Sequence, residues 1–225
     1  MFNPNFVFDS FVSTMGNKFA RAACMTFARS FNPPYNPLLL YGPTSVGKTH
    51  LLHAIGNQFR NLRPFDKVII VTAEVMMNEL LGAISNIQIE LFRIKYTSMD
   101  LLLVDDIHTL VGRKCTQEEL FNIFQTLVAK GGRLAMTSSK SLSDVLILSD
   151  EMKSRMKHSL IIRVKPPSRN EVELILSSRF AASVPMVSKN IIKMAASIGS
   201  DIRRAEGMIK QMVFVDNLAG FMKSK

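Results

Sequence analysis

The stretch LLLYGPTSVGKTH at residues 38–50 constrains the fold more than any other part of the sequence. It places an apolar run directly before a loop that matches G-x-x-x-x-G-K-[ST], at Gly42, Gly47, Lys48 and Thr49. The apolar run is typical of a strand buried on both faces, and the residues after Lys48 have helical spacing. A strand, this loop and a helix in that order predict a phosphate-binding loop, with an ordinary glycine turn as the alternative.

The residue types of this loop suit the chemistry of a triphosphate. Successive backbone N–H groups must turn inward to surround phosphate oxygens, and a side chain at Gly47 would obstruct that approach. The positive end of the following helix attracts the same anion. We expect Lys48 to reach the β- and γ-phosphates and the Thr49 hydroxyl to ligate Mg²⁺. The remaining members of the expected nucleotide cradle are Gly42, Thr44, Ser45 and Val46.

A pair of aspartates ends a second apolar run, LLLVDD at residues 101–106. Proteins with a phosphate-binding loop hold magnesium with an aspartate at the end of a second buried strand. We therefore expect Asp105 to hold the Mg²⁺ shell together with Thr49, and Asp106 to orient the attacking water. A simple strand-ending turn is the alternative interpretation.

The rest of the chain alternates buried strands with helices as far as a pair of prolines. KVIIVTA, RLAMTSS and SLIIRV indicate further strands, which predicts an α/β protein with a parallel sheet covered by helices on both sides. After Pro166 three helical patterns follow and the sequence predicts no further strand. We expect a nucleotide-binding α/β domain over residues 1–165 and a small helical lid over residues 166–225.

The charge balance favours a polyanionic partner. Twenty-eight lysines and arginines face 18 acidic residues, a formal net charge of +10, which suits nucleic acid first and anionic membrane second. A solvated basic surface with no specific partner is the alternative.

The two cysteines, Cys24 and Cys115, have no CxxC spacing, which argues against a disulfide framework or a zinc site. With no signal-peptide pattern or spanning apolar run, we expect a cytoplasmic protein that needs no membrane.

Several stretches, in order, resemble the ATPase domain of the bacterial chromosomal replication initiator DnaA, an AAA+ protein. They are NPNFVFDSFV, YNPLLLYGP with GKTHLLHAIGN, ELFRIKYTSMDLLLVDDIH, TQEELFNIF, SRMKHSLIIRVKPP and SDIRRAEG. The resemblance implies an AAA+ core with a five-stranded parallel sheet, followed by an all-helical lid, that binds ATP or ADP with Mg²⁺. We expect the chain to lack the amino-terminal and duplex-reading carboxy-terminal domains of DnaA.

The resemblance also implies roles for residues outside the loop. Arg155 falls at the family's arginine finger, which reaches the γ-phosphate held by a neighbouring subunit. Arg203 falls at the sensor-2 arginine, which reaches the bound nucleotide from the lid. ATP-bound subunits of such proteins assemble head to tail and engage DNA, and their hydrolysis is slow. Leu81 and Arg113 fall at contacts to single-stranded DNA.

The sequence departs from the family pattern at several of these places. Pro43 and Ser45 replace loop glycines, which reduces backbone freedom. Ser139 replaces an acidic sensor-1 residue, which bears on the discrimination of ATP from ADP and on hydrolysis. Three further family arginines, two at subunit contacts and one at a DNA contact, are replaced by Thr97, Glu151 and Cys115. We therefore expect weaker single-strand binding than in the family.

These features support three hypotheses. The first is an ATP-dependent replication-initiator module whose nucleotide state controls head-to-tail assembly on origin DNA. The second is a regulatory or adaptor paralogue that acts through a full-length initiator or other replication proteins, with little DNA contact of its own. The third is an AAA+ protein of the helicase-loader type, which fits the YNPLLLYG and SDIRRAEG stretches less well.

Overall fold

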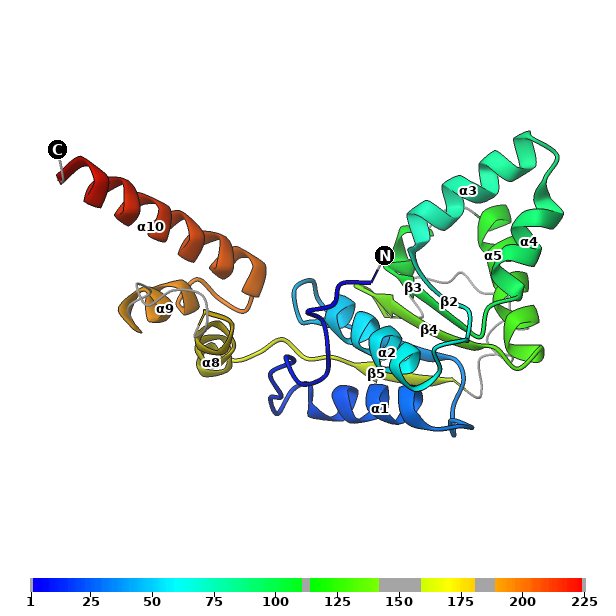
Figure 1. The fold of residues 1–225 in the computed structure, drawn as a ribbon, viewed down its shortest axis with the longest axis horizontal. Coiled ribbons are helices and arrows are strands. Elements are labelled where there is room, and N and C mark those ends of the chain that lie inside the picture. Colours follow the sequence, from blue (N-terminus) through cyan, green and yellow to red (C-terminus); the bar gives the residue numbers. More distant parts are fainter. Residues whose placement is uncertain (1, 111–113, 142–158, 181–188, 224–225) are drawn as a thin grey trace. The chain divides into compact units, whose positions relative to one another are not determined.

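The computed structural model describes residues 2–110, 114–141, 159–180 and 189–223. Its centre is one parallel sheet of five strands in the order β2-β3-β4-β1-β5 (Figure 1). The strands are β1 (Leu38–Tyr41), β2 (Val68–Thr72), β3 (Leu101–Asp105), β4 (Arg133–Ser138) and β5 (Leu160–Arg163). The α/β class and the five-stranded parallel sheet expected from the sequence are confirmed.

The three central strands are buried along almost all of their length because helices cover both faces of the sheet. Every residue of β3 and β4 is buried, as are the three leucines of β1. Leu39, Leu102 and Val104 pack into a core cluster with the helices on one face. Alternate residues such as Leu38 and Leu103 therefore point to the opposite face. A shift of register by one residue would exchange the two sets, so this packing fixes the strand pairing.

Helices form a layer on each face of the sheet (Figure 1). One layer contains the helix that follows the glycine loop, which contacts β2, β3 and β4, and the helix packed against it. The other layer contains a helical hairpin and the helix that precedes β4. The first layer is α2 (Lys48–Leu62) and α1 (Lys18–Arg29), and the second is α3 (Ala73–Ser85), α4 (Ile89–Thr97) and α5 (Lys114–Ala129).

The α3–α4 hairpin is held together by a polar contact between its two helices. The carboxylate of Glu79 on α3 accepts hydrogen bonds from Lys95 Nζ at 2.6 Å and Tyr96 Oη at 2.8 Å on α4. The Tyr96 side chain is fully buried, and this burial, with the bond to Glu79, raises the pKa of its hydroxyl. At the tip, Ile87 has φ 57°, a conformation that β-branched residues rarely adopt.

The amino-terminal residues lie along α2 and are fastened by its polar side chains. His50 Nε2 lies 2.9 Å from Val7 O, and its ring stacks on Phe6 at 4.7 Å between centroids. His53 Nδ1 accepts the backbone N–H of Asn3 at 3.2 Å, and Asn57 Nδ2 donates to Asn3 O at 2.8 Å. The two histidines therefore serve to attach the segment before α1.

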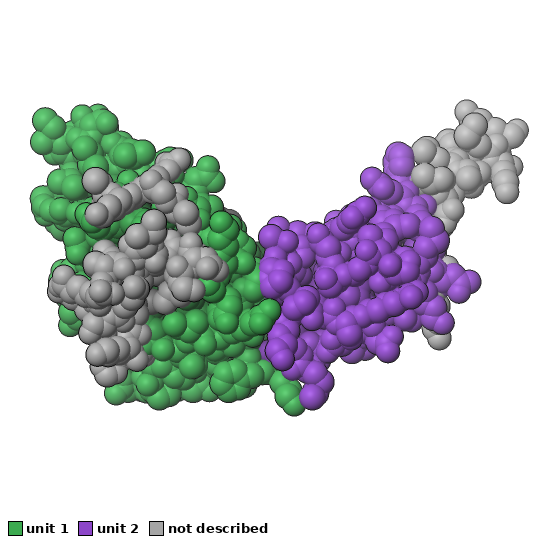
Figure 2. Space-filling view, turned by 180° about the vertical axis from the view of Figure 1, so that it is seen from behind, with its two compact units in different colours: residues 1–11, 18–42, 47–164 green, residues 12–17, 43–46, 165–225 purple. Residues whose placement is uncertain are grey.

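A second compact unit consists of helices and two short segments from earlier in the chain (Figure 2). Its helices are α8 (Arg169–Phe180), α9 (Lys189–Ala196) and α10 (Ile202–Lys223), and its core includes Val172, Leu176, Ala195, Ala205 and Ile209. Residues 12–17 and 43–46 belong to this unit, and the sheet unit contains residues 1–11, 18–42 and 47–164. Within the described ranges no helix is long and apolar enough to span a membrane.

Candidate functional site

The chemistry-bearing residues gather at one edge of the sheet because its strands are parallel. The glycine loop follows β1, Asp105 ends β3, and Ser139 follows β4. In the sheet order β4 lies between β1 and β3, so these three carboxyl ends are neighbours. Open parallel sheets bind their ligands at this edge.

The loop after β1 adopts the backbone conformation of an anion cradle. Gly42, Ser45 and Gly47 have φ values of 154°, 64° and 95°, with ordinary residues between them. A Cβ on Gly42 would lie 2.2 Å from Val164 O, so only glycine fits there. Alternation of left-handed and right-handed residues turns successive N–H groups toward one point, which suits phosphate oxygens. Ser45 adopts its left-handed conformation although it carries a side chain.

Lys48 begins α2, directly after the loop. Its side chain is 6% exposed, and Nζ donates to Gly42 O at 2.8 Å, across the base of the loop. The residue before it, Gly47, is the helix N-cap and offers no side chain to accept the first N–H groups. These N–H groups and the buried ammonium place positive charge beside the cradle, as an anion site requires.

Asp105 is positioned by hydroxyl groups from two other elements. Thr49 Oγ1 of α2 donates to Asp105 Oδ2 at 2.8 Å, and Thr137 Oγ1 of β4 donates to Oδ1. Thr137 Oγ1 also accepts the backbone N–H of Asp106 at 2.9 Å. Asp106 has φ 58°, so the chain turns sharply after β3. The hydroxyl and carboxylate oxygens of Thr49 and Asp105 form the hard donor set that Mg²⁺ prefers.

The position after β4 carries no carboxylate. The backbone N–H of Ser139 donates to His108 Nδ1 at 3.3 Å. Nδ1 also lies 3.7 Å from Asp106 Oδ1, so His108 links the turn after β3 to the end of β4.

Within the helical unit, the loop residue Ser45 meets the start of α10. The carboxylate of Asp201 caps this helix, since Oδ1 accepts the backbone N–H of Arg204 at 3.2 Å. It also accepts a hydrogen bond from the Ser45 side chain, and this bond with the capping N–H groups lowers the pKa of Asp201. Arg203 lies in the first turn of α10 and is exposed.

Other residues expected to be functional lie elsewhere or cannot be placed. Arg113, Arg155 and Glu151 lie outside the described residues. Leu81 is 44% exposed on α3, and Thr97 is 8% exposed at the end of α4. The structure thus gathers Gly42, Gly47, Lys48, Thr49, Asp105 and Asp106 at one sheet edge, with Thr44, Ser45 and Val46 in the connecting loop.

Two residues of this site were not identified from the sequence. Thr137 holds both aspartates, but a threonine inside an apolar strand gives no local signal of such a role. Asp201 stands directly before a helical pattern, and the preference of aspartate for N-cap positions could have identified it as a cap. Its contact with Ser45 joins distant parts of the chain and had no pattern to predict it.

Comparison with known proteins gives one consistent family. A family model described as the bacterial DnaA ATPase domain matches residues 2–163. The chromosomal replication initiator protein DnaA of Herpetosiphon aurantiacus is 38% identical over 217 residues, which cover 96% of this chain and 46% of that protein. The chain therefore spans about half the length of such curated relatives.

Solved structures show the same similarity. Domain III of the replication initiation protein DnaA from Thermotoga maritima matches with a TM-score of 0.90 and 29% identity, covering 98% of this chain and 92% of that chain. A replication initiator DnaA bound to AMPPCP and single-stranded DNA matches with a TM-score of 0.83 and 27% identity, covering 94% of this chain and 66% of that chain.

Proposed function

Since the chain belongs to the bacterial DnaA ATPase-domain family, we propose that it is a replication-initiator module that binds ATP or ADP with Mg²⁺. The observation that carries this proposal is the loop backbone: Gly42, Ser45 and Gly47 have positive φ values, and Lys48 Nζ donates to Gly42 O. The solved DnaA bound to AMPPCP, an ATP analogue, supports the same ligand class.

The residues at the sheet edge fit a magnesium nucleotide. The loop N–H groups would hold the phosphates, and Lys48 would exchange its bond to Gly42 O for a phosphate oxygen. Thr49 and Asp105, already hydrogen-bonded to each other at 2.8 Å, would hold Mg²⁺. The metal, when bound, neutralises phosphate charge. Asp106 would orient the attacking water, fixed by the bond of its backbone N–H to Thr137.

Two arginines complete the proposed site. Arg203 would contact the phosphates of the same subunit, and Arg155 would supply its guanidinium to a nucleotide held by a neighbour. Guanidinium is permanently charged and forked, which suits it to spread phosphoryl charge. A lone chain lacks its neighbour's arginine, so we propose that the isolated protein hydrolyses ATP slowly and acts mainly as a nucleotide switch.

Nucleotide state would control assembly and DNA binding. We propose that ATP-bound copies associate head to tail, because Arg155 acts between subunits in this scheme. The net charge of +10 favours DNA as the polyanionic partner, and a solved DnaA contains single-stranded DNA. Leu81 and Arg113 would contribute contacts. Because Thr97 and Cys115 lack charge, we propose that single-strand binding is weaker than in relatives with arginines there.

A regulatory paralogue is the second candidate, favoured by the altered positions. The Thr97 side chain is almost fully buried and the sensor-1 position is Ser139, whose backbone N–H donates to His108 Nδ1. Such a protein would pair with a full-length initiator rather than assemble alone. Pull-down against a full-length initiator, with and without ATP, compared with a DNA shift assay on the chain alone, would separate the two candidates.

Sedimentation velocity would test the proposed switch. The chain is run with Mg-ATP, with Mg-ADP and without nucleotide, each with and without a single-stranded oligonucleotide. We expect faster-sedimenting species only with Mg-ATP, increased by the oligonucleotide, and lost in Arg155→Ala. Identical profiles in all three nucleotide conditions would refute nucleotide-controlled assembly. Binding measured on the same samples would show separately whether nucleotide binds.

A further inference from the structure

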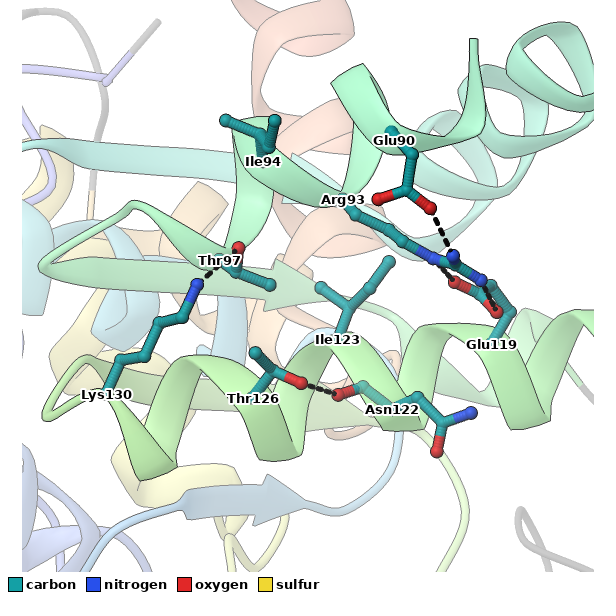
Figure 3. Close-up of a pocket in the computed structure, with 9 residues that line it drawn as sticks. All are labelled: Glu90, Arg93, Ile94, Thr97, Glu119, Asn122, Ile123, Thr126 and Lys130. Atoms are coloured by element: carbon teal, nitrogen blue, oxygen red, sulfur yellow. Dashed lines mark hydrogen bonds and ion pairs between the residues drawn. The ribbon is translucent and has the colours of Figure 1, made fainter. Parts of the chain in front are cut away.

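An open groove separates α4 from α5 on the helical layer that carries the hairpin (Figure 3). Its volume is about 290 Å³, which is enough for a few side chains. We call it the α4–α5 groove. The residues that line it are Glu90, Arg93, Ile94 and Thr97 of α4, and Glu119, Asn122, Ile123, Thr126 and Lys130 of α5 and its end.

The middle of the α4–α5 groove is apolar. Ile123 rises from α5 toward α4 and is 2% exposed, whereas Ile94 on the opposite rim is 59% exposed (Figure 3). Ile94 continues an apolar stripe on α4, because Leu91 precedes it by three residues and is 64% exposed. A stripe of exposed isoleucine and leucine that leads into a groove suits a second apolar surface.

The two ends of the groove differ in charge. At one end the Arg93 guanidinium is bound by both carboxylate oxygens of Glu119, at 2.7 and 3.0 Å, and by Glu90 at 2.6 Å. Two carboxylates around one guanidinium leave this end with excess negative charge. At the other end Lys130 Nζ lies 3.4 Å from the neutral Thr97 hydroxyl, so this end is positive.

The length of α4 sets the distance between the two ends of the groove. Glu90 and Thr97 are separated by two turns of α4, or about 10 Å along its axis.

We propose that the α4–α5 groove binds an amphipathic helix of a partner protein. That helix would place apolar side chains against the exposed Ile94 and Leu91. It would place an acidic residue against Lys130, and a basic residue two turns away against Glu90 and Glu119. A third helix fits because side chains of one helix pack into the groove between two others. Helix-in-groove recognition uses this set of apolar anchors. The charge pattern favours such a helix over a polyanion, which the carboxylate end repels.

The test uses synthetic helices of about 18 residues, long enough to fold in water when rich in alanine. The probe carries Glu at position i, Leu at i+3 and i+4, and Lys at i+7, all on one face. We call this the Glu/Lys peptide. Three control peptides differ from it: one has Glu at both charged positions (Glu/Glu), one has Lys at both (Lys/Lys), and one has Ala in place of both leucines. Fluorescence anisotropy measures their affinity for the full chain. Long-range attraction to a basic protein would rank the Glu/Glu peptide first, whereas the groove predicts that the Glu/Lys peptide binds most tightly.

Two exposed positions locate the binding on the protein. Lys130→Glu makes both ends negative, so we expect the Lys/Lys peptide to become the tightest ligand, by about threefold. Ile94→Ser should weaken the Glu/Lys peptide by about tenfold, as should loss of the leucines. Leu174→Ser, an equally exposed leucine on α8, is the matched control and should change nothing.

Several results would overturn the proposal. The first is that the Glu/Lys peptide does not bind at millimolar concentration. The second is that the Glu/Glu peptide binds more tightly. The third is that neither Lys130→Glu nor Ile94→Ser changes the affinity. If Ile94→Ser instead changes the sedimentation of the chain alone, the groove is a contact between copies and the partner-helix proposal fails. The proposal does not depend on the proposed nucleotide site. We therefore expect Lys48→Ala to bind the peptide as tightly as the unchanged chain does.

Discussion

At the scale of single residues, Ser45 departs from the residue type that its backbone favours. Glycine readily adopts the φ of 64° that Ser45 has, whereas this conformation costs other residues about 1 kcal/mol. Both Ser45→Gly and Ser45→Ala lose the hydrogen bond to Asp201, but only the alanine variant keeps a strained Cβ. We expect the glycine variant to be the more stable by about 1 kcal/mol in urea unfolding. Equal midpoints would show that the loop is not left-handed at this position.

Thr137 gives the second prediction at this scale. Its buried hydroxyl donates to Asp105 and accepts from the Asp106 backbone. Thr137→Val preserves the shape of the side chain but leaves the Asp106 N–H and the Asp105 carboxylate without this partner, so we expect a loss of about 1–3 kcal/mol in the free energy of unfolding. Thr137→Ser keeps the hydroxyl and should lose less than the valine variant. A valine variant as stable as the unchanged chain would contradict the arrangement described at this edge.

The sequence could predict residues whose role follows from local pattern and could not predict those defined by distant contacts. Lys48, Thr49 and Asp105 stand at fixed offsets from a strand end, so spacing identified them as candidates. Thr137 lies 32 residues from Asp105, and only the pairing of β3 with β4 brings the two together. Asp201 meets Ser45 through tertiary packing, which no spacing rule encodes.

At the scale of elements, the attachment of the amino-terminal segment to α2 should depend on pH. His53 must be neutral to accept the Asn3 N–H, and its burial lowers its pKa, partly offset by the negative charge of Asp105. A histidine whose folded pKa lies below its unfolded value, about 6.5, contributes stability above that pH and loses it as the pH falls. We expect the melting temperature to fall between pH 7 and pH 5, measured by circular dichroism. His53→Asn keeps an acceptor near the position of Nδ1 but does not titrate. The melting temperature of this variant should therefore fall less between pH 7 and pH 5 than that of the unchanged chain. An equal fall in both proteins would show that His53 is not the cause.

The elements themselves were well predicted where burial and periodicity agree. The five strands lie where the apolar runs placed them. Helix ends were less certain: α5 begins at Lys114 rather than near residue 116, and α10 continues to Lys223 rather than ending near residue 216. The short helix Ile107–Leu110 after Asp106 was missed, since one turn gives too few residues for a periodic pattern. The grouping of residues 12–17 and 43–46 with the helical unit depends on tertiary contacts alone.

At the scale of the whole molecule, ligand binding and stability are linked. A nucleotide that binds only the folded chain, at 100 times its Kd, adds about 2.7 kcal/mol to the free energy of unfolding. For a chain of this length that corresponds to a rise of about 5–10 °C in melting temperature. We expect this rise with Mg-ADP and a smaller one with ADP in EDTA. Asp105→Asn should abolish the difference that Mg²⁺ makes; a magnesium effect that persists in this variant would remove Asp105 as the metal ligand.

The account depends on the loop after β1 holding a magnesium nucleotide, and isothermal titration calorimetry measures this most directly. Mg-ATP is titrated into the unchanged chain and into Lys48→Ala, whose folding is checked by circular dichroism. We predict saturable binding at one site per chain, weakened at least about tenfold in Lys48→Ala by loss of a charge-assisted bond. No heat of binding to the unchanged chain at several temperatures, or equal affinity in the folded variant, would contradict the account.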